Sequence, residues 1–440
     1  MAIRCVTWAL AVVVAALTAV IVTLGFGPLN PPGGAVSPTY KTLGEIEPRI
    51  AVNAANTPGD GFALYRITQP GSYYLTQNIS VPATTVWGIS IEAAGATLDL
   101  RGFTINGAGN DVGGISVRAA GVTVRNGSIT GVSLTGIGVN TYPTGAPGLT
   151  VEDVRVIGVQ GANNPGPVPG AGRAGIFGGR GAIIRNCYVN DSPYGIAAGY
   201  NSNITGCTVE FARQTAFIIE GGAKISDCVA VGTAGGPTDG QGFVLGAGTA
   251  AINCVSRSNA GVGFVTGAES VLTGCSSTNN TRGGFLMNDN ARLERCLASS
   301  NGSWGVRVPT ATALGFSIEG CSITSNANGG ILVESFGSQG RIHGNHLRGT
   351  GASGTGVLVG VQIDPSCIDV AITENRIGGF SKAVQLDGAF CRVTGNAFSN
   401  NSGAISTSAN GAPDGSNLVG ELIGNSVQAV TAGAMANTNQ

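Results

Sequence analysis

The sequence predicts an all-β solenoid, in which short parallel strands stack coil upon coil around an apolar interior. Three observations lead to this fold class. Glycine supplies 73 of the 440 residues while charged residues make up only 11%. A short motif recurs every 20 to 26 residues between residues 187 and 321. Gly, Asn and Ser separate the apolar runs, which leaves no room for helices, and strands this short bury a face only by stacking.

Composition excludes several other classes of protein. Hydrophobic residues make up 42% of the chain, too many for a disordered protein, and no Gly-X-Y period indicates collagen. The net charge is -1. Without a basic stripe, neither nucleic acid nor an anionic membrane surface is an expected partner.

The N-terminal segment, residues 1–35, is predicted to direct export of the protein. Residues 8–26 contain no charged side chain, Arg4 precedes them, and a Gly/Pro-rich linker follows. The run reaches the lower length limit of a membrane-spanning helix and lacks a clean Ala-x-Ala site, so a cleaved signal peptide and an uncleaved anchor both stay open. Either way we expect an extracytoplasmic protein, secreted, periplasmic or anchored at the cell surface, with membrane contact only through this segment.

One residue position of the repeat, here called the slot, occurs once per coil and is expected to face the interior. It recurs 14 times, which predicts about 14 coils over residues 88–428, preceded by an N-terminal cap and entry strands over 36–87 and followed by a flexible tail over 429–440. The slot holds Phe103, Gly127, Val154, then Cys187, Cys207, Cys228, Cys254, Cys275, Cys296 and Cys321, then Asn345, Asn375, Asn396 and Asn425. Glycine is expected at left-handed turns between strands.

The cysteines in the slot form a predicted ladder of buried thiols that continues as an Asn ladder. Seven is an odd number, and stacked parallel side chains point alike, so we expect mostly free thiols. Cys367 and Cys391 are the best candidates for a disulfide bridge.

A second motif, a small residue followed by apolar, any and apolar residues, precedes most slots. Its outward position is almost entirely apolar. Parallel strands that are apolar on both faces are normally covered on both faces, so a second copy of the chain, another protein or a segment of this chain should cover this stripe. The outward positions are Phe177, Ala197, Ile218, Val244, Val265, Leu286, Arg307, Leu332 and Leu358.

These repeats resemble the right-handed parallel β-helix of the pectin-lyase-like superfamily, over about residues 60–428. The segments 70–76 (PGSYYLT) and 97–105 (TLDLRGFTI) are similar to the first coils of secreted, mostly uncharacterised bacterial members. The resemblance implies that any polysaccharide cleft lies along the sheet built from the second motif. The superfamily holds lyases, hydrolases, epimerases, tailspikes and adhesins, so the fold does not decide the function.

Catalytic motifs of these enzymes are missing. None of the four polygalacturonase-like motifs occurs, and Tyr194-Gly195 lacks the Asp and His that follow in alginate epimerases. No cofactor is evident. Calcium would need carboxylates on adjacent coils, and no such cluster stands out. His343 and His346 have no third ligand nearby, so no metal site is predicted.

One constellation remains as a candidate site. Stacking would place Arg307 outward, with Asp289 ending the strand one coil below and Glu334 ending the strand one coil above. We predict Asp289, Glu334 and Arg307 as catalytic residues and Trp304, Arg282 and Asn288 as substrate-binding residues, since a Trp face suits a sugar ring and an Arg suits a uronate. The alternative is a structural Arg-Glu surface pair.

Two functions stay open. The first is a secreted or envelope-associated protein that binds or modifies polysaccharide, with a lyase-like or glycosidase-like site. The second is a non-catalytic β-helix that serves as a structural rod or adhesin and contacts protein or another surface. Polysaccharide is the expected partner in the first case, and a second subunit or protein on the stripe Ile218, Val244, Val265, Leu286, Leu332 and Leu358 in the second.

Overall fold

The computed structural model divides the chain into two units, residues 1–48 and 49–440. In the first unit Trp8 and residues 10–18 are helical, and no helix among the described residues is long and apolar enough to span a membrane. The predicted tail at 429–440, most of the export segment and residues 36–48 lie outside the described residues. The structure describes residues 8, 10–18, 49–109, 111–139, 145–161, 173–235, 239–309, 314–334, 339–350, 358–406 and 418–419.

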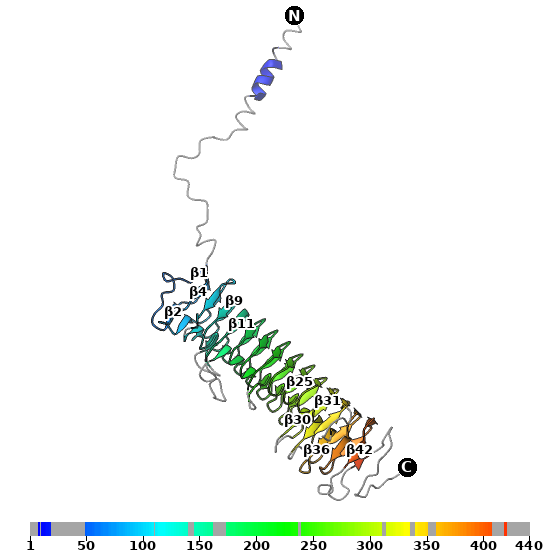
Figure 1. The fold of residues 1–440 in the computed structure, drawn as a ribbon. Coiled ribbons are helices and arrows are strands. Elements are labelled where there is room, and N and C mark those ends of the chain that lie inside the picture. The colour runs from blue at the N-terminus through cyan, green and yellow to red at the C-terminus, as the bar shows by residue number, and fades with distance from the viewer. Residues whose placement is uncertain are drawn as a thin grey trace. The chain divides into compact units, whose positions relative to one another are not determined.

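The second unit is a parallel β-solenoid with three strands in most coils, so the predicted fold class is confirmed (Figure 1). Sheet 1 has 15 strands, all paired in parallel with the strand of the next coil. They are β2(Ala63–Ile67), β5(Trp87–Ile91), β8(Gly113–Val117), β10(Ile137–Val139), β12(Ala174–Gly178), β15(Tyr194–Ala198), β18(Thr215–Ile219), β21(Phe243–Leu245), β24(Phe264–Val265), β27(Phe285–Leu286), β30(Trp304–Val308), β33(Gly329–Val333), β36(Val359–Ile363), β39(Lys382–Leu386) and β42(Gly403–Ser406).

The other strands form sheets 2 and 3, which are joined because β9(Thr123–Thr130) and β11(Thr150–Ile157) run through both. Sheet 2 also contains β1(Ile50–Ala51), β3(Ser72–Tyr74), β6(Thr97–Asp99), β13(Ile183–Arg185), β16(Asn203–Thr205), β19(Lys224–Ser226), β22(Ala250–Ile252), β25(Val271–Thr273), β28(Arg292–Glu294), β31(Ser317–Glu319), β34(Arg341–His343), β37(Ala371–Thr373), β40(Arg392–Thr394) and β43(Leu418–Val419). Sheet 3 also contains β4(Ile79–Ser80), β7(Thr104–Asn106), β14(Tyr188–Asn190), β17(Thr208–Glu210), β20(Val229–Val231), β23(Val255–Arg257), β26(Ser276–Thr278), β29(Leu297–Ser299), β32(Ser322–Thr324), β35(His346–Arg348), β38(Arg376–Gly378) and β41(Ala397–Ser399).

The predicted slot lies at the corner between sheets 2 and 3. Thirteen of its fourteen copies, from Phe103 to Asn396, fall in one register from coil to coil. Asn425 lies outside the described residues. The residue before the slot is left-handed in most coils. It is Gly in some of them and Asn, Asp, Arg or Glu in others, as at Asn186 with φ 54° and Arg295 with φ 51°. Polar residues tolerate this bend at the surface, so glycine is not required in every coil.

The slot cysteines are buried, and none of them forms a disulfide bond. Each sulfur donates to backbone carbonyls, for example Cys207 Sγ to the Ile184 carbonyl at 3.6 Å. The predicted bridge between Cys367 and Cys391 is wrong, because both residues are thiols. The Cys367 sulfur instead donates to the Val333 carbonyl of the preceding coil at 3.5 Å, and the Cys391 sulfur donates to the Ala389 carbonyl of its own coil at 3.4 Å.

This environment predicts that the nine described cysteines do not react in the folded protein. Inaccessibility is the reason, because each of the nine side chains is at most 2% exposed. Alkylation needs contact between the sulfur and the reagent, and a buried thiol does not offer it. Peptide mapping after iodoacetamide treatment should find all nine unmodified in native protein and modified in guanidinium chloride. Labelling of a slot cysteine without denaturant would contradict the buried ladder.

Two further interior columns complete the core. Four phenylalanines on sheet 1 stack with ring centroids 4.7, 4.6 and 5.1 Å apart, and all are at most 1% exposed: Phe217, Phe243, Phe264 and Phe285. At the corner between sheets 3 and 1, a ladder of buried side-chain amides links successive coils at 3.0, 3.0 and 2.9 Å: Asn259, Asn280, Asn301 and Asn326. These columns fix the register of sheet 1, on whose outer face the candidate site lies.

Candidate functional site

The outer face of sheet 1 carries one column of side chains in strict register. The predicted stripe from Phe177 to Leu332 follows this column. Its next member is Gln362, which pairs with Leu332, so the assignment of Leu358 was wrong. Both Gly356-Val357-Leu358-Val359 and Gly360-Val361-Gln362-Ile363 fit the motif, and the fold uses the second, which turns the polar side chain outward.

The stripe is covered to different degrees along its length. Phe177, Ala197 and Leu332 are buried. The middle members are half-buried: Ile218, Val244, Val265 and Leu286. Both ends of the column are polar, from Arg66 and Ser90 at one end to Gln362 and Gln385 at the other. The partly exposed apolar part of the predicted stripe is therefore confined to these four coils, and the exposed Arg307 follows it.

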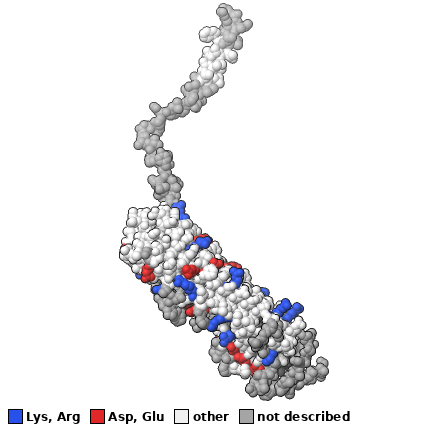
Figure 2. All heavy atoms as spheres, in the orientation of Figure 1, with Lys and Arg blue, Asp and Glu red and all other residues white. Residues whose placement is uncertain are grey.

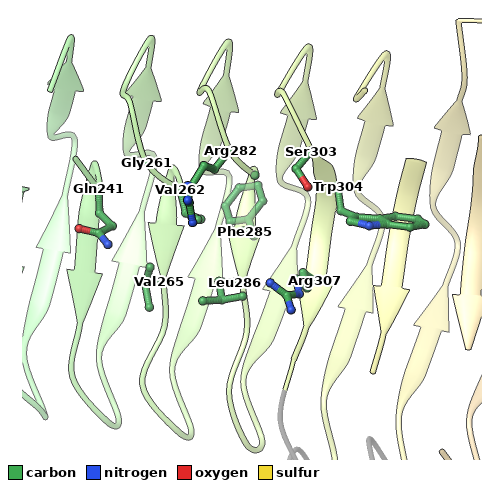
Figure 3. A pocket seen from close by; sticks show the side chains of 11 residues that line it. Gln241, Gly261, Val262, Val265, Arg282, Phe285, Leu286, Ser303, Trp304 and Arg307 are labelled. Atoms are coloured by element: carbon green, nitrogen blue, oxygen red, sulfur yellow. The ribbon is translucent and has the colours of Figure 1, made fainter. Parts of the chain in front are cut away.

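A hollow of about 400 Å³ opens on this part of sheet 1. Val265 and Leu286 form an aliphatic floor, and Arg282 and Arg307 stand at its sides (Figure 3). Gln241, Ser303 and Trp304 add polar and aromatic groups to the wall. The hollow spans successive coils, so an extended ligand lying across the strands would contact all of these side chains.

Arg307 is held in place by Glu334. Arg307 Nε donates to Glu334 Oε2 at 2.6 Å, while the Arg307 side chain remains 49% exposed. The guanidinium is turned toward Leu286 in Figure 3. A guanidinium has five N–H donors, and the bond to Glu334 uses the one on Nε. The other donors remain available to an anionic ligand over the floor.

Arg282 supplies a second cation. It is exposed, lines the same hollow and has no acidic partner among the described residues. Figure 3 shows its side chain extending toward Val262 of the neighbouring coil. Two guanidiniums face one hollow, and Glu334, the carboxylate that binds Arg307, lies on the far side of Arg307 and does not line the hollow. The hollow therefore carries a net positive charge.

Trp304 is half-buried and lies across the next coil. A Cβ added at Gly329 would come within 2.4 Å of Trp304 Cζ3, so the indole rests directly on that glycine. Gly329 pairs with Trp304 in the sheet register and therefore must lack a side chain. The indole is fixed at the edge of the hollow, where its exposed surface can contact a ring.

The other predicted residues do not join the hollow. Asn288 Nδ2 donates to the Thr266 carbonyl at 2.7 Å, which ties this side chain to the coil below. Neither Asn288 nor Asp289 is among the lining residues. The structure thus brings together Arg282, Trp304 and Arg307, with Glu334 behind Arg307. The catalytic role of Asp289 stays a prediction.

The Arg307–Glu334 pair has a counterpart at the other end of sheet 1. Arg66 pairs with Ser90, two residues before Glu92, just as Arg307 pairs with Leu332, two residues before Glu334. The Arg66 guanidinium binds Glu92 at 2.5 Å and Asp60 at 3.1 Å. The Arg–Glu pair thus recurs as a structural feature of sheet 1. The copy at Arg307 is the candidate for ligand binding because it lies beside the hollow.

Sequence reasoning missed a row of carboxyl groups on three adjacent coils. Glu334, Asp364 and Asp387 directly follow β33, β36 and β39. Burial raises the pKa of Asp364, a hydrogen bond from Gln362 opposes this, and the charges of Glu334 and Asp387 raise it further. The 30 residues between Glu334 and Asp364 exceed the usual spacing, which hid the row in the sequence.

This row does not make a metal centre. Among the residues that the structure describes, no three His, Cys, Asp or Glu side chains are arranged to hold a metal ion. His343 contacts Thr373 Oγ1 at 2.9 Å and Glu374 at 3.7 Å, while His346 is exposed. The two histidines therefore have separate surroundings.

Comparison with known families decides the handedness of the coil. The model of the family described as right handed beta helix region matches residues 260–420. Over these residues the parallel solenoid is a right-handed β-helix. The resemblance to right-handed parallel β-helices is thus confirmed, and the matched part includes Arg282, Trp304, Arg307 and Glu334.

Solved structures similar to this β-helix have low sequence identity. The A-module of a mannuronan C-5 epimerase from Azotobacter vinelandii is 17% identical, covers 80% of this chain and 91% of its own, with a TM-score of 0.39. The catalytic unit of a GH87 α-1,3-glucanase from Streptomyces thermodiastaticus is 11% identical, with 77% and 64% covered and a TM-score of 0.42. The Dettilon tailspike is 14% identical, with 79% and 63% covered and a TM-score of 0.37. Comparison with curated proteins finds no match.

Proposed function

We propose that the outer face of sheet 1 binds an acidic polysaccharide across the coils from Gly261 to Arg307. The observation that carries the proposal is the pairing of two guanidiniums, one without an acidic partner among the described residues, around a hollow with an aliphatic floor and a Trp at its edge. Carboxylates along the polymer would bind the forks of Arg282 and Arg307, because guanidinium geometry matches carboxylate geometry.

The floor and the indole suit the rest of such a ligand. Sugar rings present apolar C–H faces, which pack on Leu286, Val265 and the exposed part of Trp304. Charged side chains of both signs are interspersed along the face shown in Figure 2, and the net charge of the chain is -1, so a general basic surface would not explain binding of an acidic polymer. The local positive charge at the hollow would explain it. The N-terminal run of residues 8–26 supports an extracytoplasmic setting, where such polymers occur.

Binding is the core of the proposal, and modification of the bound chain is its extension. Glu334 already accepts a hydrogen bond from Arg307, and Asp364 on the next coil has a raised pKa, as a general acid requires. New reducing ends or unsaturated uronate absorbance from polyuronates, with and without calcium, would establish turnover. Folded protein that binds the polymer without either product is a binding protein.

Loss of either arginine should weaken polyuronate binding about tenfold, which corresponds to one charge-assisted hydrogen-bonded contact. The measurement is isothermal titration of the full chain with polygalacturonate and alginate oligomers, with neutral dextran as reference. Arg282→Ala and Arg307→Ala are compared with Arg292→Ala, an exposed arginine of β28 on sheet 2 that removes the same charge from the same region. Equal affinity in all three variants, or equal binding of dextran, would overturn the proposal.

A further inference from the structure

A second hollow, of about 670 Å³, lies on sheet 3 and belongs to a different face and different coils from the first. The strands β35, β38 and β41 form it, near the C-terminal end of the described solenoid. Six polar side chains line it: His346, Arg348, Thr350, Arg376, Ser399 and Asn400. Every one of them can donate a hydrogen bond, and no carboxylate is among them.

The hollow exists because one of the outward-facing positions of sheet 3 is a glycine and has no side chain. Gly378 lies between Arg348 and Ser399 in the register of sheet 3. Arg376 is two residues earlier on the same strand, so its side chain leaves on the same face as this gap. A Cβ at Gly378 would come within 2.6 Å of Ser399 Oγ, which shows how closely the surrounding groups approach the bare backbone.

The two arginines are not neutralised by the protein. Arg348 and Arg376 are exposed, and neither has an acidic partner among the described residues. Other arginines on the solenoid do have such partners, as Arg185 has Glu152 and Arg341 has Glu319. Two guanidiniums beside one gap repel each other, and a bound anion would remove this repulsion.

We propose that this hollow binds a tetrahedral oxyanion, a phosphate or sulfate group. Two forks on adjacent coils, with hydroxyl and amide donors from β41 and its turn, offer donors from several directions. Such an arrangement suits three oxygens better than the two of a planar carboxylate. No Phe, Tyr or Trp side chain lines the hollow, in contrast to the Trp304 site, so charge and hydrogen bonding select the ligand.

The test is calorimetric titration of the full chain with inorganic phosphate, inorganic sulfate and, as the carboxylate arm, glucuronate. We expect phosphate or sulfate to bind at least tenfold more tightly than glucuronate. The ratio of the phosphate affinity to the sulfate affinity then shows which of the two groups the site prefers. Arg348→Ala and Arg376→Ala should each weaken binding at least tenfold, and Arg376→Lys should weaken it less because it keeps the charge but loses the fork.

Arg392→Ala, an exposed arginine of β40 on sheet 2, is the matched control and should leave the affinity unchanged. Glucuronate is also titrated into Arg282→Ala, because the carboxylate site proposed at Arg282 and Arg307 would bind it in the natural protein. The proposal is overturned if neither oxyanion binds, if glucuronate binds Arg282→Ala as tightly as the oxyanions do, or if Arg392→Ala loses as much affinity as Arg376→Ala.

Discussion

Phe264→Ala should lower the free energy of unfolding by about 4 kcal/mol, as expected for a buried Phe replaced by Ala. The Phe264 ring is fully buried and stacks between Phe243 and Phe285, with centroids 4.6 and 5.1 Å away. Its two neighbours are fixed by the sheet register and cannot move into the space. Chemical denaturation of the full chain, followed by far-UV circular dichroism, measures the change.

The solenoid architecture makes this loss local. Each coil contacts only its neighbours, so the damage is not shared along the rod, and hydrogen exchange should accelerate most in the strands from β18 to β27. Phe211→Ala removes the same atoms from a ring that is 57% exposed and should cost much less. A loss below about 1 kcal/mol for Phe264→Ala would mean that the core repacks, against the behaviour of well-packed interiors.

The fold was predictable because the corner slot recurs with nearly constant spacing. A cysteine every 20 to 26 residues is rare enough to be seen in one sequence, and stacking follows from strands too short to bury a face alone. The second corner gave a weaker signal. Asn259, Asn280, Asn301 and Asn326 each follow a slot cysteine by five residues, but Asn is common at turns, so this ladder was missed.

The candidate site was predictable only in part. Arg307, Glu334 and Trp304 could be placed because a single copy of the second motif marks each of their strands. The register of β36 could not be predicted, because two overlapping motifs compete there and only side-chain packing chooses between them. The same irregular stretch hid Asp364 and the row of carboxyl groups. The hollow beside Arg348 and Arg376 could not be predicted either, because the gap at Gly378 is recognised only when the strand register is known.

Asn280→Ala should cost about 3 kcal/mol of unfolding free energy, since it leaves buried donors without an acceptor. Asn280 Oδ1 accepts from the backbone nitrogen of Asn259 at 3.1 Å and from its side-chain nitrogen at 3.0 Å. Asn280 Nδ2 donates in turn to Asn301 Oδ1 at 3.0 Å. Removing one amide therefore interrupts a chain that links three coils at the corner leading into the strands of the Arg282 site.

Two variants separate the hydrogen-bond loss from the loss of volume. Asn280→Asp keeps the volume and one acceptor but replaces the donating group, which places a buried carboxylate opposite Asn301 Oδ1 and should cost at least as much as Ala at neutral pH. Asn328→Ala changes an exposed residue at the same end of sheet 1 and should cost under about 0.5 kcal/mol. If the Asp variant were as stable as the natural protein, the amide ladder would contribute shape alone, and the register of sheet 1 would depend on the phenylalanine column instead.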